Sequence, residues 1–270
     1  MNFKRIELIF FIAFVALDIF LFISYSQKDD TVISTSNSTS EDSLSSVLKS
    51  IRDDQISYGR LSSKKGNGYY IASPVRNDLQ LNLDALQNQT ATYENHKIVS
   101  TFENPIKIKE SNRPQDTLNS IVDDSTKIVD GKEYKYDRSL STRTTVVYTQ
   151  TIHGIPVYLT SGQLRFSIRS GYAIEYTQGI LENIEILHDQ KPIISQERAV
   201  IWLYQYNKLM NDSTVEWVNL GYTKLLAVNN NVVYIPTWVI AVKSNSTGNI
   251  QYRRINAFSG AIMDESSSMD

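Results

Sequence analysis

The most pronounced apolar segment of the chain lies near its N-terminus. Residues 8–23 read LIFFIAFVALDIFLFI, which is apolar apart from Asp18. Extended to residues 6–25, the segment predicts a helix of roughly 30 Å, about the hydrocarbon thickness of a bilayer. Two basic residues precede it, so the positive-inside rule places residues 1–5 in the cytoplasm and the rest of the chain outside. We therefore expect a single transmembrane anchor over residues 6–25.

A cleaved signal peptide is the alternative interpretation of this segment. Cleavage requires a short apolar core followed by small residues at the cleavage site. Here SYSQKDD follows the core, and the aromatic Tyr25 does not suit such a site. The pattern favours the uncleaved anchor, and a lipoprotein is excluded because the chain has no cysteine to acylate.

Asp18 lies slightly past the midpoint of the predicted anchor. A carboxylate at that depth costs on the order of 2.5–3.5 kcal/mol, and a donor on another membrane helix would offset this cost. Its helical neighbours are bulky and apolar. The predicted transmembrane interaction face consists of Phe11, Phe14, Val15, Asp18, Leu21 and Phe22. The alternative is a protonated Asp18 near the outer interface, where snorkelling of the side chain and local water defects allow the membrane to accommodate it.

After the anchor, the pattern becomes polar and then periodic. Residues 26–43 are mostly small and polar, which predicts a flexible stalk. A helix is expected from residue 44, with Asp42 or Ser43 as its N-cap. Its apolar face consists of Leu44, Val47, Leu48 and Ile51. Further elements are expected near residues 55–61, 68–72 and 92–102 as strands and 79–87 as a helix. Together they predict a first small α+β domain over residues 44–103.

A second domain is expected over residues 119–264. Residues 104–118 contain two prolines and many polar side chains, which is typical of a connection between domains. Alternating apolar and polar positions predict strands in the second domain. They cover residues 134–137, 144–150, 163–168, 172–178, 181–186, 215–228, 232–242 and 250–258. The tail, residues 265–270, is expected to be disordered.

Two turns and one helix organise this second domain. The dipeptides at 130–131 and 170–171, Asp-Gly and Ser-Gly, predict hairpin turns. A helix is expected after Ser195 as its N-cap. Its apolar face consists of Ala199, Trp202, Leu203, Tyr206 and Met210. The related motifs VVYTQ (146–150) and IEYTQ (174–178) are interpreted as two adjacent strands of one sheet. The overall expectation is an α+β fold in which each of the two domains packs a helix on an antiparallel sheet.

Composition excludes several classes of function. The 270 residues carry 27 basic and 29 acidic side chains, a net charge of −2, and this near balance gives no electrostatic case for nucleic-acid binding. Without cysteine there is no thiol nucleophile or thiolate metal site, and the three histidines are far apart in sequence. Two S-x-x-K matches, at residues 46–49 and 62–65, lack the accompanying S-D-N and K-T-G motifs. We expect no catalytic, cofactor-binding or metal-ligating site.

A set of short motifs in a fixed order resembles the YycI (WalI) family. The motifs are LDIFL (17–21), GIPV (154–157), SGQLRF (161–166), LGYTKL (220–225), PTWVI (236–240) and RRINAFSGAIMD (253–264). The resemblance covers essentially the whole chain. It implies a non-enzymatic, membrane-anchored regulator of a WalK-type sensor histidine kinase in Gram-positive bacteria. Such a regulator works together with a YycH (WalH) partner, through transmembrane and ectodomain contacts, and adjusts cell-wall metabolism.

A weaker similarity links the second domain to modules that restrain proteases. Residues 148–180 are similar to the strand pattern of secreted-protease propeptides, and residues 195–263 are similar to a PepSY module. The alternative function is therefore a PepSY-like extracytoplasmic module that inhibits a secreted protease. A membrane-tethered wall hydrolase is a third hypothesis, but no motif supports it.

Overall fold

The computed structural model describes residues 11, 13–21 and 40–263, which fall into two units, Met1–Ser50 and Ile51–Asp270. Residues 11 and 13–21 are helical. Within the described part of the chain, no helix combines the length and apolarity needed to cross a membrane. Most of the residues that would complete the expected anchor at either end, and residues 26–39 of the expected stalk, lie outside the described residues.

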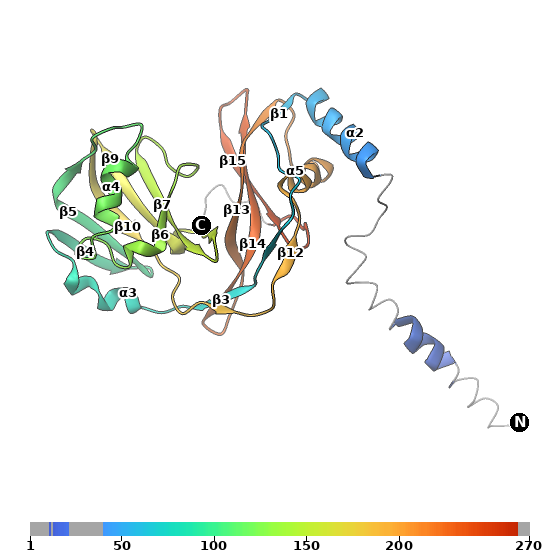
Figure 1. The fold of residues 1–270 in the computed structure, drawn as a ribbon, viewed down its shortest axis with the longest axis horizontal. Helices are drawn as coiled ribbons and strands as arrows, with labels where there is room; N and C mark the ends of the chain where they lie inside the picture. Colours follow the sequence, from blue (N-terminus) through green and yellow to red (C-terminus); the bar gives the residue numbers. More distant parts are fainter. Residues whose placement is uncertain (1–10, 12, 22–39, 264–270) are drawn as a thin grey trace, which may run out of the picture. The chain divides into compact units, whose positions relative to one another are not determined.

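The helix α2 covers Ser40–Asp53 (Figure 1). It begins earlier than the sequence predicts. Residues 40–43 therefore belong to the helix and not to the stalk, and Asp42 and Ser43 lie within its first turn instead of capping it. Serine and acidic residues also suit the first turn of a helix, so the pattern alone does not fix the cap. At the other end of α2, Ile51 is fully buried in the second unit.

One seven-stranded antiparallel sheet has the strand order β4-β5-β10-β9-β7-β6, with β8 paired to β7 (Figure 1). Its strands are β4 (Gln89–Glu94), β5 (Lys97–Lys107), β6 (Tyr134–Asp137), β7 (Thr145–Ile152), β8 (Ile155–Pro156), β9 (Gln163–Arg169) and β10 (Tyr172–Gln178). The helix α4 (Gln115–Val122) contributes Leu118 and Val122 to the same core. The rings of Phe102, Tyr148, Phe166 and Tyr176 pack together at the centre of that core.

A six-stranded sheet has the order β1-β13-β14-β3-β11, with β15 paired to β14. Its strands are β1 (Ile56–Tyr58), β3 (Ile71–Pro74), β11 (Glu185–Ile186), β13 (Ser213–Val228), β14 (Asn231–Ser244) and β15 (Ile250–Asn256). Its pairs are antiparallel except β1 with β13, which is parallel. The short strands β2 (Gly66–Gly68) and β12 (Lys191–Ile193) form a separate pair.

The helix α5 (Gln196–Gln205) contacts β14 and β15. Ser195 caps it as expected, since Ser195 Oγ accepts a hydrogen bond of 3.2 Å from the Arg198 backbone N–H. The helix is shorter than its predicted apolar face. Tyr206 and Met210 lie beyond its end and are exposed, and the side chains it buries are Ala199, Val200, Ile201 and Leu203.

The two sheets do not follow the expected division of the chain at residues 104–118. β3 joins the six-stranded sheet, whereas β4 and β5 join the seven-stranded sheet, although all three precede residue 108. The first residues of the expected connection are the end of β5. The sequence pattern predicts strands but carries no information on which distant strands pair, so it suggested two consecutive domains where the strands interleave.

The two turns expected in the second domain have different outcomes. Ser170 and Gly171 form the hairpin between β9 and β10, with φ values of 51° and 79°. Such left-handed φ values at both positions are what a two-residue hairpin turn requires. Asp130 and Gly131 form no hairpin. Asp130 has φ 48° and precedes the 3₁₀ turn Gly131–Glu133, which leads directly into β6.

The repeated Tyr-Thr-Gln motifs lie on β7 and β10, which flank β9 and are not adjacent to each other. Their glutamines hold connecting segments by buried hydrogen bonds. Gln150 donates to the Leu181 carbonyl at 2.9 Å and accepts from the Leu181 N–H at 2.8 Å, while Gln178 donates to the Val129 carbonyl. The repeat therefore has a structural role in one sheet, as expected, but on strands separated by a third.

Candidate functional site

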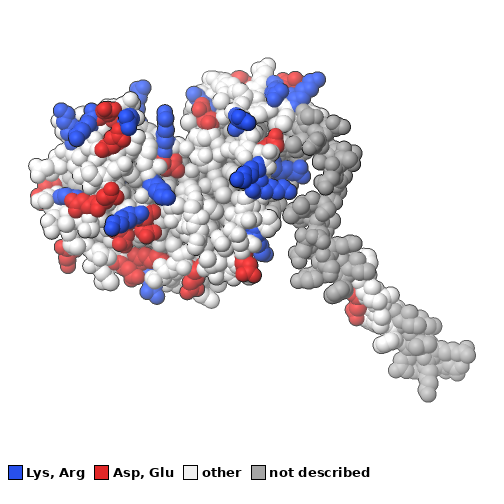
Figure 2. All heavy atoms as spheres, in the orientation of Figure 1, with Lys and Arg blue, Asp and Glu red and all other residues white. Residues whose placement is uncertain are grey.

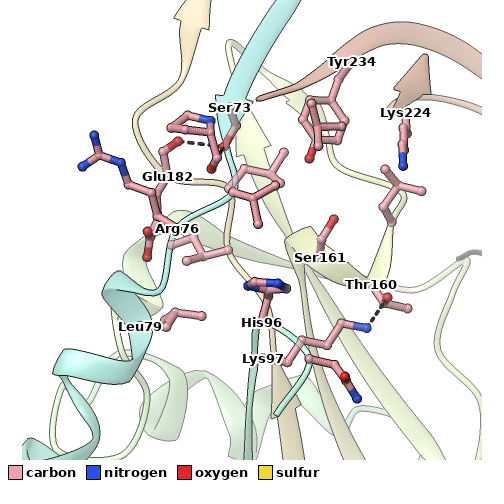
Figure 3. A pocket seen from close by; sticks show the side chains of 17 residues that line it. Ser73, Arg76, Leu79, His96, Lys97, Thr160, Ser161, Glu182, Lys224 and Tyr234 are labelled. Atoms are coloured by element: carbon pink, nitrogen blue, oxygen red, sulfur yellow. Dashed lines mark hydrogen bonds between the residues drawn. The ribbon is translucent and has the colours of Figure 1, made fainter. Parts of the chain in front are cut away.

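A cavity of about 400 Å³ lies within the second unit, where segments of both sheets meet (Figure 3). The six-stranded sheet contributes residues of β3, β13 and β14. The seven-stranded sheet contributes the turn between β4 and β5, and the connections before β9 and after β10 complete the wall. The lining side chains include Ser73, Arg76, Leu79, His96, Lys97, Leu159, Thr160, Ser161, Leu181, Glu182, Lys224, Val232 and Tyr234.

The turn between β4 and β5 brings two of these side chains to the cavity. Asn95 and His96 both have left-handed backbone conformations, with φ of 51° and 61°, and they reverse the chain between Glu94 and Lys97. His96 Nδ1 lies 3.1 Å from Asn77 Oδ1. Lys97, the first residue of β5, donates a hydrogen bond from Nζ to Thr160 Oγ1 (Figure 3). The sequence pattern, which predicted one strand from residue 92 to residue 102, missed this hairpin.

Glu182 is the single carboxylate among the cavity-lining residues. It follows β10, and its backbone carbonyl accepts a hydrogen bond of 2.7 Å from Ser73 Oγ of β3. Burial, and next the nearby Asp78 carboxylate, raise the pKa of the Glu182 side chain above its ordinary value. Its Oε2 atom is buried without a hydrogen-bond partner. The Glu182 side chain is thus held where the charged form is disfavoured.

The positive groups around the cavity differ in their surroundings. Arg76 lies 3.8 Å from Asp78, and both side chains are about half exposed. In Figure 3, Lys97 and Lys224 lie on the Thr160 side of the cavity, opposite Arg76 and Glu182. Cationic side chains therefore predominate on the Thr160 side.

Hydroxyl groups add hydrogen-bonding capacity to the apolar part of the cavity. Burial raises the pKa of Tyr234 to about 12, and a hydrogen bond with Ser161 opposes this shift. Tyr234 therefore stays protonated at physiological pH and acts as a neutral hydrogen-bonding group. Leu159, Leu181 and Tyr234 belong to one buried apolar cluster.

The described residues assemble no group of three or more His, Asp or Glu side chains that could hold a metal ion. The three histidines lie in separate places. His96 is in the β4–β5 turn, and His153, with φ 48°, is in the turn between β7 and β8. His188 packs edge-on against Tyr70. On the face shown in Figure 2, basic and acidic side chains are interspersed over the second unit.

The predicted transmembrane interaction face is described only in part. Phe11, Phe14, Val15 and Leu21 are exposed on the N-terminal helix, with exposed fractions of 40–66%, and Asp18 is exposed as well. Phe22 lies outside the described residues. The exposed fraction does not distinguish this face, because Phe20 on the other side of the helix is as exposed as Phe11. The face stays a prediction.

A test of the cavity's electrostatics is the substitution Glu182→Gln. The folded state binds the Glu182 proton more tightly than the unfolded chain does, so this group stabilises the fold below its unfolded pKa of about 4.3. That contribution is lost as pH rises through the raised folded pKa. We expect Glu182→Gln to melt at a higher temperature than the unaltered protein at pH 7, and the difference to shrink toward pH 4.

Thermal unfolding followed by circular dichroism at the two pH values measures this difference. Glu185→Gln, on the exposed strand β11, is the control for removing one negative charge nearby. An equal difference at pH 4 and pH 7 would show that the Glu182 carboxylate is not destabilised by its surroundings.

Comparisons with known proteins identify the family of this chain. Two solved structures show a distant similarity. An uncharacterized protein from Eubacterium rectale ATCC 33656 has a TM-score of 0.42 and 13% identity, covering 77% of this chain and 90% of that one. The Bacillus megaterium YpeB C-terminal domain has a TM-score of 0.37 and 12% identity, covering 84% and 96%. No curated protein gives a significant match. The YycI protein family model, in contrast, matches residues 34–258. The chain therefore belongs to the YycI family of regulatory proteins.

Proposed function

We propose that this protein is a non-enzymatic regulator, anchored in the cell membrane, of a WalK-type sensor histidine kinase that controls cell-wall homeostasis. The family match over residues 34–258 carries this proposal. The regulator acts with a YycH-like partner, through its transmembrane helix and through ectodomain contacts. Its N-terminus is cytoplasmic and residues after the anchor are extracellular, as the basic residues before the apolar segment indicate.

The physical argument for a membrane contact rests on Asp18. An apolar segment with one carboxylate has no internal donor for that group, and a single helix has no bundle in which to hide it. A polar group on a helix of the kinase or of the YycH-like partner would satisfy it. The bulky side chains around Asp18, Phe14 and Val15 among them, supply the packing surface that helix association in lipid requires.

Crosslinked co-purification from native membranes tests the proposal. The full-length chain is compared with a chain that starts at Asp29. We expect the full-length chain to recover a sensor kinase, and the shortened chain to recover much less of it. Recovery of a secreted protease with both chains, and of no kinase, would favour the PepSY-like inhibitory module instead.

The substitution Asp18→Leu tests the intramembrane contact directly. We expect kinase recovery to fall about tenfold, because an interhelical hydrogen bond in lipid is worth about 1–2 kcal/mol. Asp18→Asn keeps a hydrogen-bonding group and should retain most of the recovery. If complex formation and signalling are unchanged with Asp18→Leu, Asp18 is not part of the contact.

Two phenylalanines offer a matched pair that maps the interacting face. Phe14 lies on the predicted face and Phe20 lies about 200° around the helix from Asp18, yet their exposed fractions are 63% and 66%. Phe14→Ala should weaken kinase recovery, whereas Phe20→Ala should not. Equal losses from both substitutions would contradict a one-sided face.

A further inference from the structure

The cavity between the two sheets combines features that no kinase contact explains. Lys97 comes from β5 of the seven-stranded sheet and Lys224 from β13 of the six-stranded sheet. Both side chains line the same cavity, and Thr160 between the sheets accepts a hydrogen bond from Lys97 (Figure 3). Two segments whose lysines are 127 residues apart in sequence thus each contribute an ammonium-bearing side chain to the lining of one cavity.

The wall near Thr160 has a positive electrostatic balance. Glu182, the carboxylate that lines the cavity, lies on the opposite side in Figure 3, and burial raises its pKa above the ordinary value. Arg76 is matched by Asp78, so that pair contributes little net charge. An anionic group placed near Lys97, Lys224 and the Thr160 hydroxyl would accept charge-assisted hydrogen bonds. It would not have to strip water from the lining carboxylate, Glu182, which lies on the other side of the cavity.

Apolar side chains form another part of the lining. Leu159 and Leu181 are buried members of the core cluster between β3, β8 and β13–β14, and Val232 packs against that cluster. A volume of about 400 Å³ falls within the range of roughly 300–1,000 Å³ that is typical of small-molecule sites. The apolar part of the lining favours an occupant that carries an apolar body over a fully hydrated inorganic ion, which would leave these side chains in contact with water.

We infer that this cavity is a binding site for a small amphipathic anion, a phosphate or carboxylate carried on a short apolar body. Lys97, Lys224 and Thr160 hold the anionic group, and Leu159, Leu181 and Val232 pack against the apolar body. Since the two lysines come from different sheets, the bound anion bridges the sheets and stabilises their arrangement. The site thereby gives the extracytoplasmic region a small-molecule input in addition to protein contacts.

Four six-carbon probes with different head groups test this inference: hexyl phosphate, hexanoate, 1-hexanol and hexylammonium. Each is added to the full-length chain in zwitterionic nanodiscs, and saturation-transfer NMR measures binding against empty nanodiscs. We expect one of the two anions to bind at least tenfold more tightly than hexanol, and hexylammonium not to bind. A preference between hexyl phosphate and hexanoate identifies the anionic group. Equal binding of all four probes, or displacement of hexyl phosphate by an equimolar amount of inorganic phosphate, would overturn the inference.

Substitutions of lining residues test whether the anion binds in this cavity. Lys97→Gln and Lys224→Gln should each weaken the preferred anion about tenfold, the loss expected for one charge-assisted hydrogen bond. The double variant Lys132→Gln/Lys135→Gln, on the exposed surface near β6, is the matched control and should bind normally. Val232→Trp fills the cavity without removing a charge and should abolish binding, while circular dichroism verifies that it folds. Binding that survives both Val232→Trp and the lysine substitutions would place the anion elsewhere.

Discussion

Replacing Phe166 by alanine is expected to lower the free energy of unfolding by about 3–5 kcal/mol. Phe166 lies on β9, the strand between β7 and β10, and its side chain is fully buried. Its ring centroid lies 5.9 Å from that of Tyr148 and 5.8 Å from that of Tyr176, on the two neighbouring strands. Alanine would leave a cavity that these rings cannot fill, because strand pairing fixes their backbones.

Urea or thermal unfolding of the purified protein measures this loss. For a domain of this size, about 3–5 kcal/mol corresponds to a fall in melting temperature of roughly 6–20 °C. Tyr172→Ala is the matched control, since this aromatic residue on β10 of the same sheet is 40% exposed. We expect less than about 1 kcal/mol from the control. Equal losses from the two substitutions would contradict a core centred on Phe166.

Replacing Gly131 by alanine is expected to cost about 3 kcal/mol, the upper end of the range for overpacking. A Cβ atom at this position would lie 1.6 Å from the Val122 carbonyl oxygen at the end of α4. The obstructing atom belongs to the backbone, so no rotamer change relieves the clash. Relief requires α4 to move away from the turn that leads into β6, and Val122 and Leu118 would lose packing in the aromatic core.

Gly59→Ala is the control for the conformational effect of alanine. A Cβ atom at Gly59 has no heavy atom within 4 Å, and its backbone does not require a left-handed φ. This substitution should change the stability by less than about 1 kcal/mol, and alanine's smaller unfolded-state entropy makes it neutral or slightly stabilising. A stable Gly131→Ala variant would mean that the contact between α4 and the turn before β6 is easily displaced.

The cavity and the proposed membrane contact concern separate parts of the chain. The cavity lies within the second unit, whereas the predicted interaction face lies on the N-terminal segment. Substitutions in each part therefore test the anion-binding proposal and the membrane-contact proposal independently. Asp18→Leu should leave anion binding unchanged, and the lysine variants should leave the intramembrane contact unchanged.

Features that depend only on neighbouring residues follow from local patterns in the amino-acid sequence. The strands Tyr134–Asp137 and Tyr172–Gln178 begin and end where the alternation predicts, and Ser195 caps α5. Ser170 and Gly171 form their hairpin because the turn chemistry is contained in the two residues themselves. The motifs that resemble the YycI family also identified the family that the match over residues 34–258 shows.

Long-range packing selects which strands share a sheet and where the cavity lies. β3 pairs with β14, more than 150 residues later, and β5 pairs with β10, because burial of complementary faces selects partners that no local pattern encodes. The same long-range pairing brings Lys97, Thr160 and Lys224 to one cavity. In the sequence they are ordinary polar residues in a strand end, a loop and a strand. Their ammonium and hydroxyl groups come to line one cavity only when the two sheets fold together.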